Sequence, residues 1–193
     1  MEDEIKFFRF RQIRLAICEI EPSGTIRRLR EKAAVTRLTR LLLGHDLTIG
    51  HQPDGRPFIS ASPDFQSPEI SISHSRNYAA VAIAPPHCRT GIDIEDTDRL
   101  SQFSRLASRV LNDKEIEKYS SAPDGLLKAW TLKEAAFKAS HLHPVDFLHD
   151  IFLPEAASDI IHIHKKSAEE SLKIFYSGEV LPGLILSVVS SHF

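Results

Sequence analysis

The sequence predicts an α+β protein built in two halves. A helical segment and several strands come first, a run of helices follows, and strands close the chain. Pro85-Pro86 interrupts this order, and the alternation of strand and helix starts again after it. We therefore place an N-terminal α/β half at residues 1–86 and a C-terminal half at residues 87–193.

Composition limits the classes of function. The chain has 193 residues, of which 42% are hydrophobic and 26% charged, so it can bury a core as one domain or two small packed ones. A net charge of -2 argues against bulk binding of nucleic acid. No apolar run has the length of a membrane span or the form of a signal peptide. We expect a soluble cytoplasmic protein, in which Cys18 and Cys88 are buried or idle thiols; the alternative is a disulfide between them.

The first clear element is a helix over residues 25–43. Apolar residues recur in it at helical spacing, and Gly44 follows as a C-terminal stop. This segment contains six basic residues and a single acidic residue, Glu31. Arg30, Arg37 and Arg40 share one side, which is either a solvated face or a wall that binds anions.

A hairpin closes the first half. The turn residues 53–57 precede Phe58 and Ile59. In residues 69–75 apolar and small polar residues alternate, which predicts a strand ending at His74. A turn at Asn77 then leads into an apolar run, Tyr78–Ala84, as the returning strand.

The second half begins with a strand over residues 90–95, with Ile92 and Ile94 toward the core and Asp93 and Glu95 on the other side. Three helices follow along the chain. They cover residues 102–109, a short segment capped by Asn112 or Asp113, and residues 126–140. The remaining strands are expected at residues 160–164, 172–176 and 184–189, with a turn at Pro182-Gly183.

Asp93 and Glu95 form the first part of a candidate metal site. At positions i and i+2 of a strand they share a face, with backbone positions about 7 Å apart, and their side chains can converge on one cation. The alternative is a solvent-facing strand edge. Gly91 and the intervening isoleucines favour a tightly packed strand, where acids are costly unless they are paired.

Glu134 supplies a third carboxylate, flanked by Lys133 and Lys138. Glu134 and Lys138 alone would be an ordinary surface ion pair, and Trp130 and Phe137 indicate core packing. If Glu134 joined the two strand acids, the three charges would repel unless a cation were bound. Ligands that are all oxygen favour Mg²⁺, which usually takes phosphate oxygens as well, and the two lysines would then serve those phosphates.

In these segments the chain resembles the 4′-phosphopantetheinyl transferases, specifically the monomeric type that activates surfactin synthetase and other peptide synthetases. Gly91-Ile92-Asp93-Ile94-Glu95 resembles the family's strand motif, and residues 130–138 resemble its Trp-Ser/Thr-x-Lys-Glu-Ala/Ser-x-x-Lys helix motif. Gly55-Arg56-Pro57 is similar to a Gly-Lys-Pro turn and Ser73-His74-Ser75 to a Ser-His-Ser strand end. Ala107, Arg109 and Glu115 fit a further spacing, so five ordered motifs span residues 37–138.

The resemblance implies two similar α/β halves related by a pseudo-twofold axis, with coenzyme A between them. It implies transfer of the phosphopantetheine arm of coenzyme A to a serine of an apo acyl or peptidyl carrier protein, releasing 3′,5′-ADP. The expected partners are thus coenzyme A and the carrier, with no nucleic acid and no membrane, and the expected state is a monomer.

The resemblance also implies roles for single residues. Asp93, Glu95 and Glu134 would bind Mg²⁺, and Glu134 or a water on the metal would take the serine proton. Lys138 and Lys133 would neutralise phosphate charge as the P–O bond breaks. The nucleotide's phosphates would be contacted by four residues: Arg37, Arg56, Ser73 and His74. The catalytic set is therefore Asp93, Glu134 and Lys138.

Some residues depart from the family pattern. Arg56 stands in place of the usual lysine, which keeps the charge and changes its geometry. A glycine-rich stop is replaced by residues 140–144, where His141 and His143 could also suggest a metal pair. His162 and His164 are expected on a solvated strand face. Two alternatives stay open: a non-catalytic relative that binds coenzyme A or a carrier protein, and a Mg²⁺-dependent phosphohydrolase.

Overall fold

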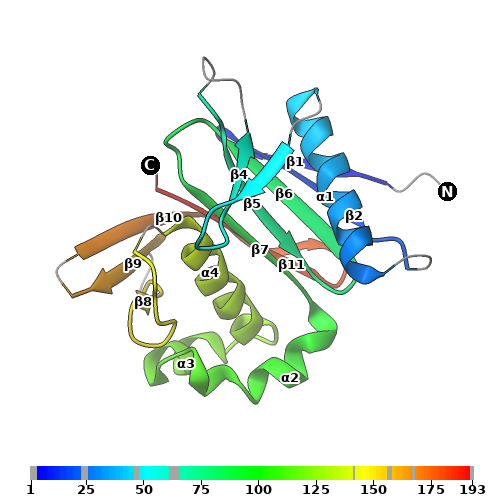
Figure 1. Ribbon diagram of the computed structural model, residues 1–193. Coiled ribbons are helices and arrows are strands. Elements are labelled where there is room, and N and C mark those ends of the chain that lie inside the picture. Colours follow the sequence, from blue (N-terminus) through cyan, green and yellow to red (C-terminus); the bar gives the residue numbers. More distant parts are fainter. Residues whose placement is uncertain are drawn as a thin grey trace.

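The structure is a computed structural model that describes residues 4–22, 26–45, 48–60, 66–140, 142–155, 158–166 and 168–191. It is a mixed α/β fold with four helices and three sheets in the described residues (Figure 1). This composition confirms the predicted mixture of helices and strands and is compatible with a transferase fold of the expected kind. Among the described residues, each helix is too short or too polar to cross a bilayer.

The first sheet is antiparallel and has the strand order β1-β2-β6-β5. Its strands are β1 (Lys6–Phe10), β2 (Ile13–Glu19), β5 (Glu69–His74) and β6 (Tyr78–Ala84). The predicted hairpin is confirmed, because β5 and β6 pair antiparallel. A separate two-stranded ribbon joins β3 (Thr48–His51) to β4 (Pro57–Ser60).

Helix α1 (Arg27–Leu43) packs on one face of the first sheet through Val35, Leu38 and Leu42 (Figure 1). The helix ends as predicted at Gly44, whose left-handed backbone (φ 81°) suits a residue without a Cβ. Its basic residues remain on the outer side, and Arg37 and Arg40 are exposed.

The second sheet is also antiparallel, in the order β7-β11-β10-β9-β8. Its strands are β7 (Thr90–Asp96), β8 (Ile151–Phe152), β9 (Ile160–Lys165), β10 (Ala168–Leu181) and β11 (Leu184–Ser190). The strand expected at residues 172–176 is the middle of the longer β10, which contains two irregularities in its pairing with β11. Such bulges interrupt the two-residue alternation used to set strand limits.

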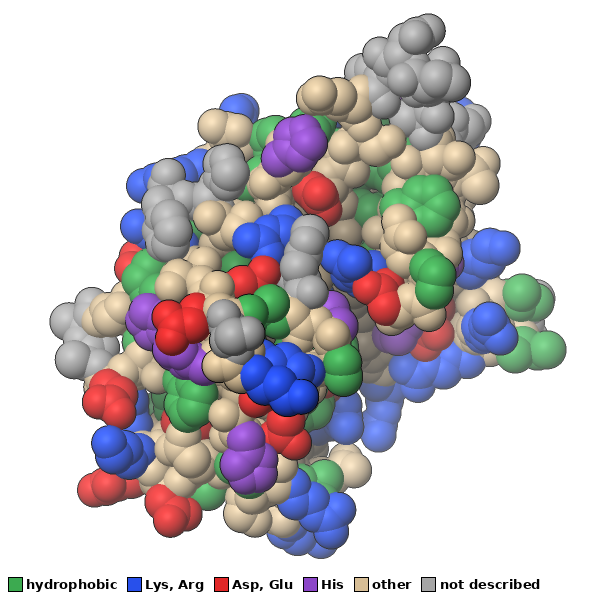
Figure 2. Space-filling model, turned by 60° about the vertical axis from the view of Figure 1, so that its left-hand side comes forward, with side chains coloured by type: hydrophobic (Ala, Val, Ile, Leu, Met, Phe, Trp, Pro, Cys, Tyr) green, Lys and Arg blue, Asp and Glu red, His purple; other side chains and the backbone are tan. Residues whose placement is uncertain are grey.

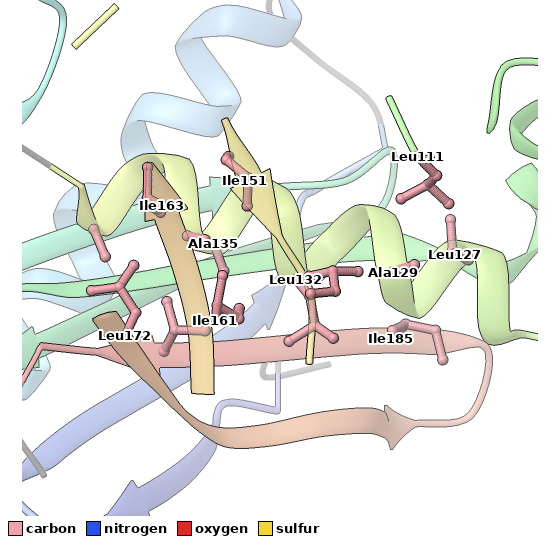
Figure 3. Packing of buried hydrophobic residues seen from close by; sticks show 14 of the residues in the cluster. Leu111, Leu127, Ala129, Leu132, Ala135, Ile151, Ile161, Ile163, Leu172 and Ile185 are labelled. Atoms are coloured by element: carbon pink, nitrogen blue, oxygen red, sulfur yellow. The ribbon is translucent and has the colours of Figure 1, made fainter. Parts of the chain in front are cut away.

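Helix α4 (Gly125–Ala139) covers one face of the second sheet. Leu132 and Ala135 of α4 meet Ile161, Leu172 and Ile185 from three strands (Figure 3). The further members of this cluster labelled in the figure are Leu111, Leu127, Ala129, Ile151 and Ile163.

The prediction of a single helix over residues 102–109 is wrong. The chain instead forms three short pieces before α3 (Asp113–Tyr119): the 3₁₀ turns η1 (Thr97–Arg99) and η2 (Ala107–Arg109), with α2 (Leu100–Ser104) between them. Backbone bonds from Leu106 to Phe103 and from Arg109 to Leu106 close three-residue turns. These turns carry both Phe103 and Ala107 into the core, so packing overrides the helical pattern.

The N-terminus of α3 is capped by Asn112, one of the two predicted caps. The Asn112 side chain accepts from the backbone N–H of Glu115, and the Glu115 carboxylate accepts from the backbone N–H of Asn112. This reciprocal capping box satisfies two backbone donors at the start of the helix.

A third core lies between the two sheets. It contains Ile13, Leu15 and Ile17 of β2 together with Ile92 and Ile94 of β7. The inward direction of Ile92 and Ile94 is as predicted, and the expectation that Cys18 and Cys88 are thiols outside a disulfide is confirmed, since both are buried and neither is in a disulfide. The pseudo-twofold relation between the halves and their division at residue 86 stay predictions.

Serine side chains join the edges of the two sheets. The hydroxyl of Ser71 accepts a hydrogen bond from the backbone N–H of Ile92 at 3.0 Å, and that of Ser73 accepts one from Ile94 at 3.2 Å. Further along, the Asp96 carboxylate accepts from the backbone N–H of Arg76 at 2.9 Å. We call this contact between β5 and β7 the serine seam.

Candidate functional site

Three carboxylates from the second half line one pocket of about 280 Å³, here called the acidic pocket. Asp93 and Glu95 come from β7 and Glu134 from α4, so the structure brings together the three acids that the sequence singled out. The complete lining is Ile72, Ser73, His74, Asp93, Glu95, Trp130, Glu134 and Lys138.

Gly91 allows α4 to lie close against β7. A Cβ at this position would overlap the carbonyl oxygen of Ala135 in α4. Because side chains alternate along a strand, Gly91, Asp93 and Glu95 share one face, and that face looks toward α4. The missing side chain thus brings the helix, with Glu134 and Lys138, up to the two strand acids.

Asp93 is buried and is bound on one side. Its Oδ1 accepts from the Ser73 hydroxyl at 2.8 Å and from the Lys138 ammonium at 2.8 Å. Its Oδ2 is buried and has no hydrogen-bond partner among the described residues. A buried carboxylate oxygen without a donor is costly, so this atom is a natural place for a bound cation.

Glu95 is held by Arg99 and Trp130. One guanidinium nitrogen of Arg99 donates to both carboxylate oxygens, at 2.7 and 2.8 Å, and the indole N–H of Trp130 lies 3.4 Å from Oε1. Burial raises the pKa of Glu95, and repulsion from Asp93 raises it further, whereas Arg99 opposes the shift.

The carboxyl group of Glu134 has a strongly raised pKa. Burial is the largest cause, repulsion from Asp93 and Glu95 adds to the rise, the charge of Lys138 opposes it, and together they raise the pKa to about 7. A carboxylate with a pKa near neutrality can exchange a proton at physiological pH. Glu134 is therefore suited to accept a proton from a bound hydroxyl.

Lys138 lies where the acidic pocket meets a larger one. Besides Asp93, its ammonium donates to the carbonyl oxygen of Ile92 at 3.1 Å. Lys138 and Ile72 line both the acidic pocket and a second pocket of about 590 Å³, here called the basic pocket. An elongated ligand with charge along its length could occupy the two together.

The basic pocket carries cationic side chains at several points. Arg56, from the predicted turn, lines it while its Nε donates to Asp54 at 2.7 Å. Arg89 also lines it and pairs with Glu170. Sequence reasoning missed Arg89, because a lone arginine before a strand carries no signal. Figure 2 shows Lys and Arg side chains beside Asp and Glu over one face of the molecule.

Ser73 and His74 of β5, both expected to contact phosphates, line the acidic pocket, but only His74 is exposed. Ser73 is buried, and its hydroxyl donates to Asp93 and accepts from the backbone N–H of Ile94. Ser73 therefore orients the Asp93 carboxylate. His74 is half exposed, lines the acidic pocket and has Nε2 3.7 Å from Glu31 of α1. His74 can thus reach a ligand from the rim.

The structure does not bring the other two expected contacts to either pocket. Lys133 is 0% exposed and forms an ion pair with Glu115 at 2.8 Å. Burial lowers the pKa of Lys133, and Glu115 opposes that shift. Arg37 lines a separate small pocket between α1 and β2. Among the histidines, His143 lines the basic pocket, whereas His141 lies outside the described residues.

The donor set at the acidic pocket suits a hard divalent cation. It consists of three carboxylates; the pKa values of Glu95 and Glu134 are raised, and the buried Oδ2 of Asp93 has no donor among the described residues. Across the described ranges, however, no three His, Cys, Asp or Glu side chains are already set in coordination geometry. Lys138 forms an ion pair with Asp93, and Arg99 forms one with Glu95. A bound cation would therefore share these carboxylates with the two basic side chains.

Comparison with known proteins bears on the same part of the chain. Residues 89–180 match the model of the 4′-phosphopantetheinyl transferase superfamily. The match includes Asp93, Glu95, Glu134 and Lys138, and it supports a phosphopantetheinyl transferase function in general terms. Arg56 and His74 lie before the matched stretch. No curated protein matches the chain.

Proposed function

We propose that the protein is a Mg²⁺-dependent transferase that moves the 4′-phosphopantetheine arm of coenzyme A to a serine of an apo carrier protein. The products are the holo carrier and 3′,5′-ADP. The observation that carries the proposal is the convergence of Asp93, Glu95 and Glu134 on one pocket, joined through Lys138 to a basic pocket. We further propose a monomer of the type that activates peptide synthetases, acting in the cytoplasm.

The basic pocket is the place for the nucleotide portion of coenzyme A. Arg56 and Arg89 lie there, and His74 approaches from the rim of the adjoining pocket. Cationic and hydrogen-bonding side chains recognise phosphate groups through charge-assisted bonds. The pyrophosphate would then lie at the junction, next to Lys138.

Asp93, Glu95 and Glu134 would hold the Mg²⁺ ion. When bound, the ion neutralises charge on phosphate oxygens and lowers the cost of placing three carboxylates together. Lys138 adds a second positive charge at the point where both pockets meet. Phosphoryl transfer depends chiefly on such alignment and charge neutralisation, so the chain's own residues are placed to promote it.

Glu134 is the proposed general base. A serine hydroxyl is a weak nucleophile until a positioned group accepts its proton. Without a bound cation, burial and the neighbouring acids raise the pKa of Glu134 to about 7, which makes this carboxylate a stronger base than an ordinary glutamate. The serine oxygen then forms the new P–O bond, and the bond to 3′,5′-ADP breaks.

Incubation with coenzyme A, Mg²⁺ and several apo carrier proteins, followed by intact mass measurement, tests the proposal. We expect at least one carrier to gain the mass of one phosphopantetheine, with an equal amount of 3′,5′-ADP released. A carrier whose acceptor serine is replaced by alanine should show no gain. Bound but unchanged coenzyme A with every carrier would contradict the transferase and favour a binding protein, and cleavage without transfer would favour a phosphohydrolase.

A further inference from the structure

A buried ion pair fastens α4 on a side that does not line either pocket. The ammonium of Lys133 lies 2.8 Å from Oε2 of Glu115 and donates to the carbonyl oxygen of Phe147 at 2.7 Å. Both side chains are buried, Lys133 completely. Among the described residues, the largest fully buried side chains are otherwise isoleucines and leucines, so a lysine at this depth is unusual.

Glu115 connects the pair to two more segments. Its Oε2 accepts from the backbone N–H of Asn112 at 3.0 Å, and its Oε1 accepts from the backbone N–H of Leu153 at 2.9 Å. The two charged groups thereby tie α4 to the start of α3, to the segment after α4 and to the chain that follows β8. Each hydrogen bond is directional, so the pair restricts rotation of α4 about its axis as well as its distance from the sheet.

Helix geometry links this restriction to the acidic pocket. Successive residues of an α-helix are turned by about 100°, so Lys133 points away from its neighbour Glu134. Glu134 and Lys138 are four residues apart and share a face. With Lys133 anchored at Glu115, that shared face is directed at β7, where Lys138 bonds to Asp93.

We propose that Lys133 and Glu115 are a positioning pair that sets the rotation of α4 and so directs Glu134 and Lys138 into the acidic pocket. Lys133 does not contact the phosphates of coenzyme A. A buried ion pair need not stabilise a fold more than apolar residues would, but removal of one partner leaves a buried charge unpaired. The kinetic part of this inference rests on the proposed transferase function; the stability and binding parts do not.

The central test compares Lys133→Met with Lys138→Met and with Lys128→Met. Lys128 is the matched control, because it is on the same helix and pairs with Asp124 at 2.8 Å near the surface. Lys133→Met should lower the melting temperature by about 10 °C, because Glu115 loses its partner in the interior. Lys128→Met should change it by about 2 °C or less.

Binding of coenzyme A, measured by isothermal titration calorimetry, separates positioning from phosphate contact. Lys133→Met keeps the ammonium of Lys138, which Asp93 and the Ile92 carbonyl also hold, and should keep the Kd within about threefold of the wild type. Lys138→Met removes that charge and should weaken binding more than about tenfold. A Lys133→Met variant with an unchanged melting temperature and Kd weakened as strongly as in Lys138→Met would overturn the proposal.

Kinetics at a temperature where circular dichroism shows every variant folded separates positioning from stability alone. Lys133→Met should lower kcat at least about tenfold with the KM for coenzyme A within about threefold. Unchanged kcat in the folded variant would overturn the positioning role. If Lys133→Met does not fold, Glu115→Gln replaces it in this test. This variant keeps the size of the side chain and one acceptor oxygen, and should lower kcat by a smaller factor with a nearly unchanged KM.

The double variant Lys133→Met/Glu115→Gln completes a cycle. It removes the unpaired charge and should recover part of the melting temperature lost in Lys133→Met; strictly additive losses would contradict a direct coupling. A wild-type protein that modifies no carrier would refute the proposed function, while the melting temperatures would still decide whether the pair acts on the fold.

Discussion

The Ser73 hydroxyl donates a 2.8 Å hydrogen bond to Asp93 Oδ1 across the serine seam, from one sheet to the other. The same hydroxyl accepts from the backbone N–H of Ile94. Asp93 is therefore held on one oxygen by a residue 20 positions earlier, while Oδ2 has no donor in the part of the chain that the structure describes. The direction of this carboxylate depends on the neighbouring sheet as well as on its own strand.

Ser73→Ala should loosen both the seam and the acid. The backbone N–H of Ile94 and Asp93 Oδ1 each lose a partner in the interior, which should cost about 1–3 kcal/mol of the free energy of unfolding. Urea denaturation measures the loss. Ser104→Ala is the matched control, because the hydroxyl of Ser104 lies on the surface and donates to the carbonyl oxygen of Leu100 in its own helix. Equal stabilities of the two variants would contradict the role of the seam.

Gly91→Ala should separate α4 from β7. The added methyl group would overlap the backbone of Ala135, and backbone cannot turn aside as a side chain can. We expect a loss of about 1–3 kcal/mol or more in the free energy of unfolding, together with loss of transfer.

Gly178→Ala is the comparison for that variant. A Cβ at Gly178 would meet its nearest neighbour, the Tyr176 hydroxyl, at 3.4 Å, which is ordinary contact. Its stability and transfer rate should stay close to those of the wild type. If Gly91→Ala matched it in both measurements, the close approach of helix and strand would be unimportant for the site.

Glu134→Gln should abolish transfer and keep the fold. The amide has nearly the shape of the carboxyl group but cannot accept the serine proton or bind a cation as an anion does. Single-turnover assays by intact mass should show a loss of at least about 100-fold, with an unchanged circular dichroism spectrum. Near-normal turnover would mean that the proton goes elsewhere.

The pH dependence of stability provides a test of Glu134 without any substrate. Its pKa is about 7 in the folded protein, above the ordinary value of 4.5. Between these values the folded state holds more protons than the unfolded state, so the contribution of Glu134 to stability falls as pH rises from about 4.5 to 7. Below this window the contribution is fully retained.

Glu134→Gln lacks this titration and should become more stable relative to the wild type as pH rises. The difference between the two should grow by on the order of 1–3 kcal/mol between pH 5 and pH 8. Urea denaturation in the presence of a chelator, which removes stray divalent cations, measures it at both pH values. A difference that does not change with pH would show that the carboxyl group titrates normally.

Local patterns in the sequence predicted the elements that carry the acidic pocket. Alternation in residues 90–95 assigned Asp93 and Glu95 to one face, and four-residue spacing assigned Glu134 and Lys138 to another. Lys133 was expected beside them because it is adjacent in sequence. Adjacent helical residues point in different directions, and which face meets the site is decided by packing on β7 and β11 that no local pattern encodes.

Strands near the N-terminus were missed for a related reason. In β1, Phe8 and Phe10 are partly buried while Phe7 and Arg9 are exposed, which is a two-residue alternation. The segment is short, and aromatic residues on both faces obscure the pattern. The contact between Ser73 and Asp93 was also beyond local reasoning, because it depends on how two sheets meet.

The serine seam makes the acidic pocket a shared property of two sheets. One wall is β5 of the first sheet, and the others are β7 of the second sheet and the helix packed on it. Neither sheet alone encloses the three acids. A chain that has folded only one of them has no complete pocket, so docking of the sheets decides when during folding the protein first acquires its site.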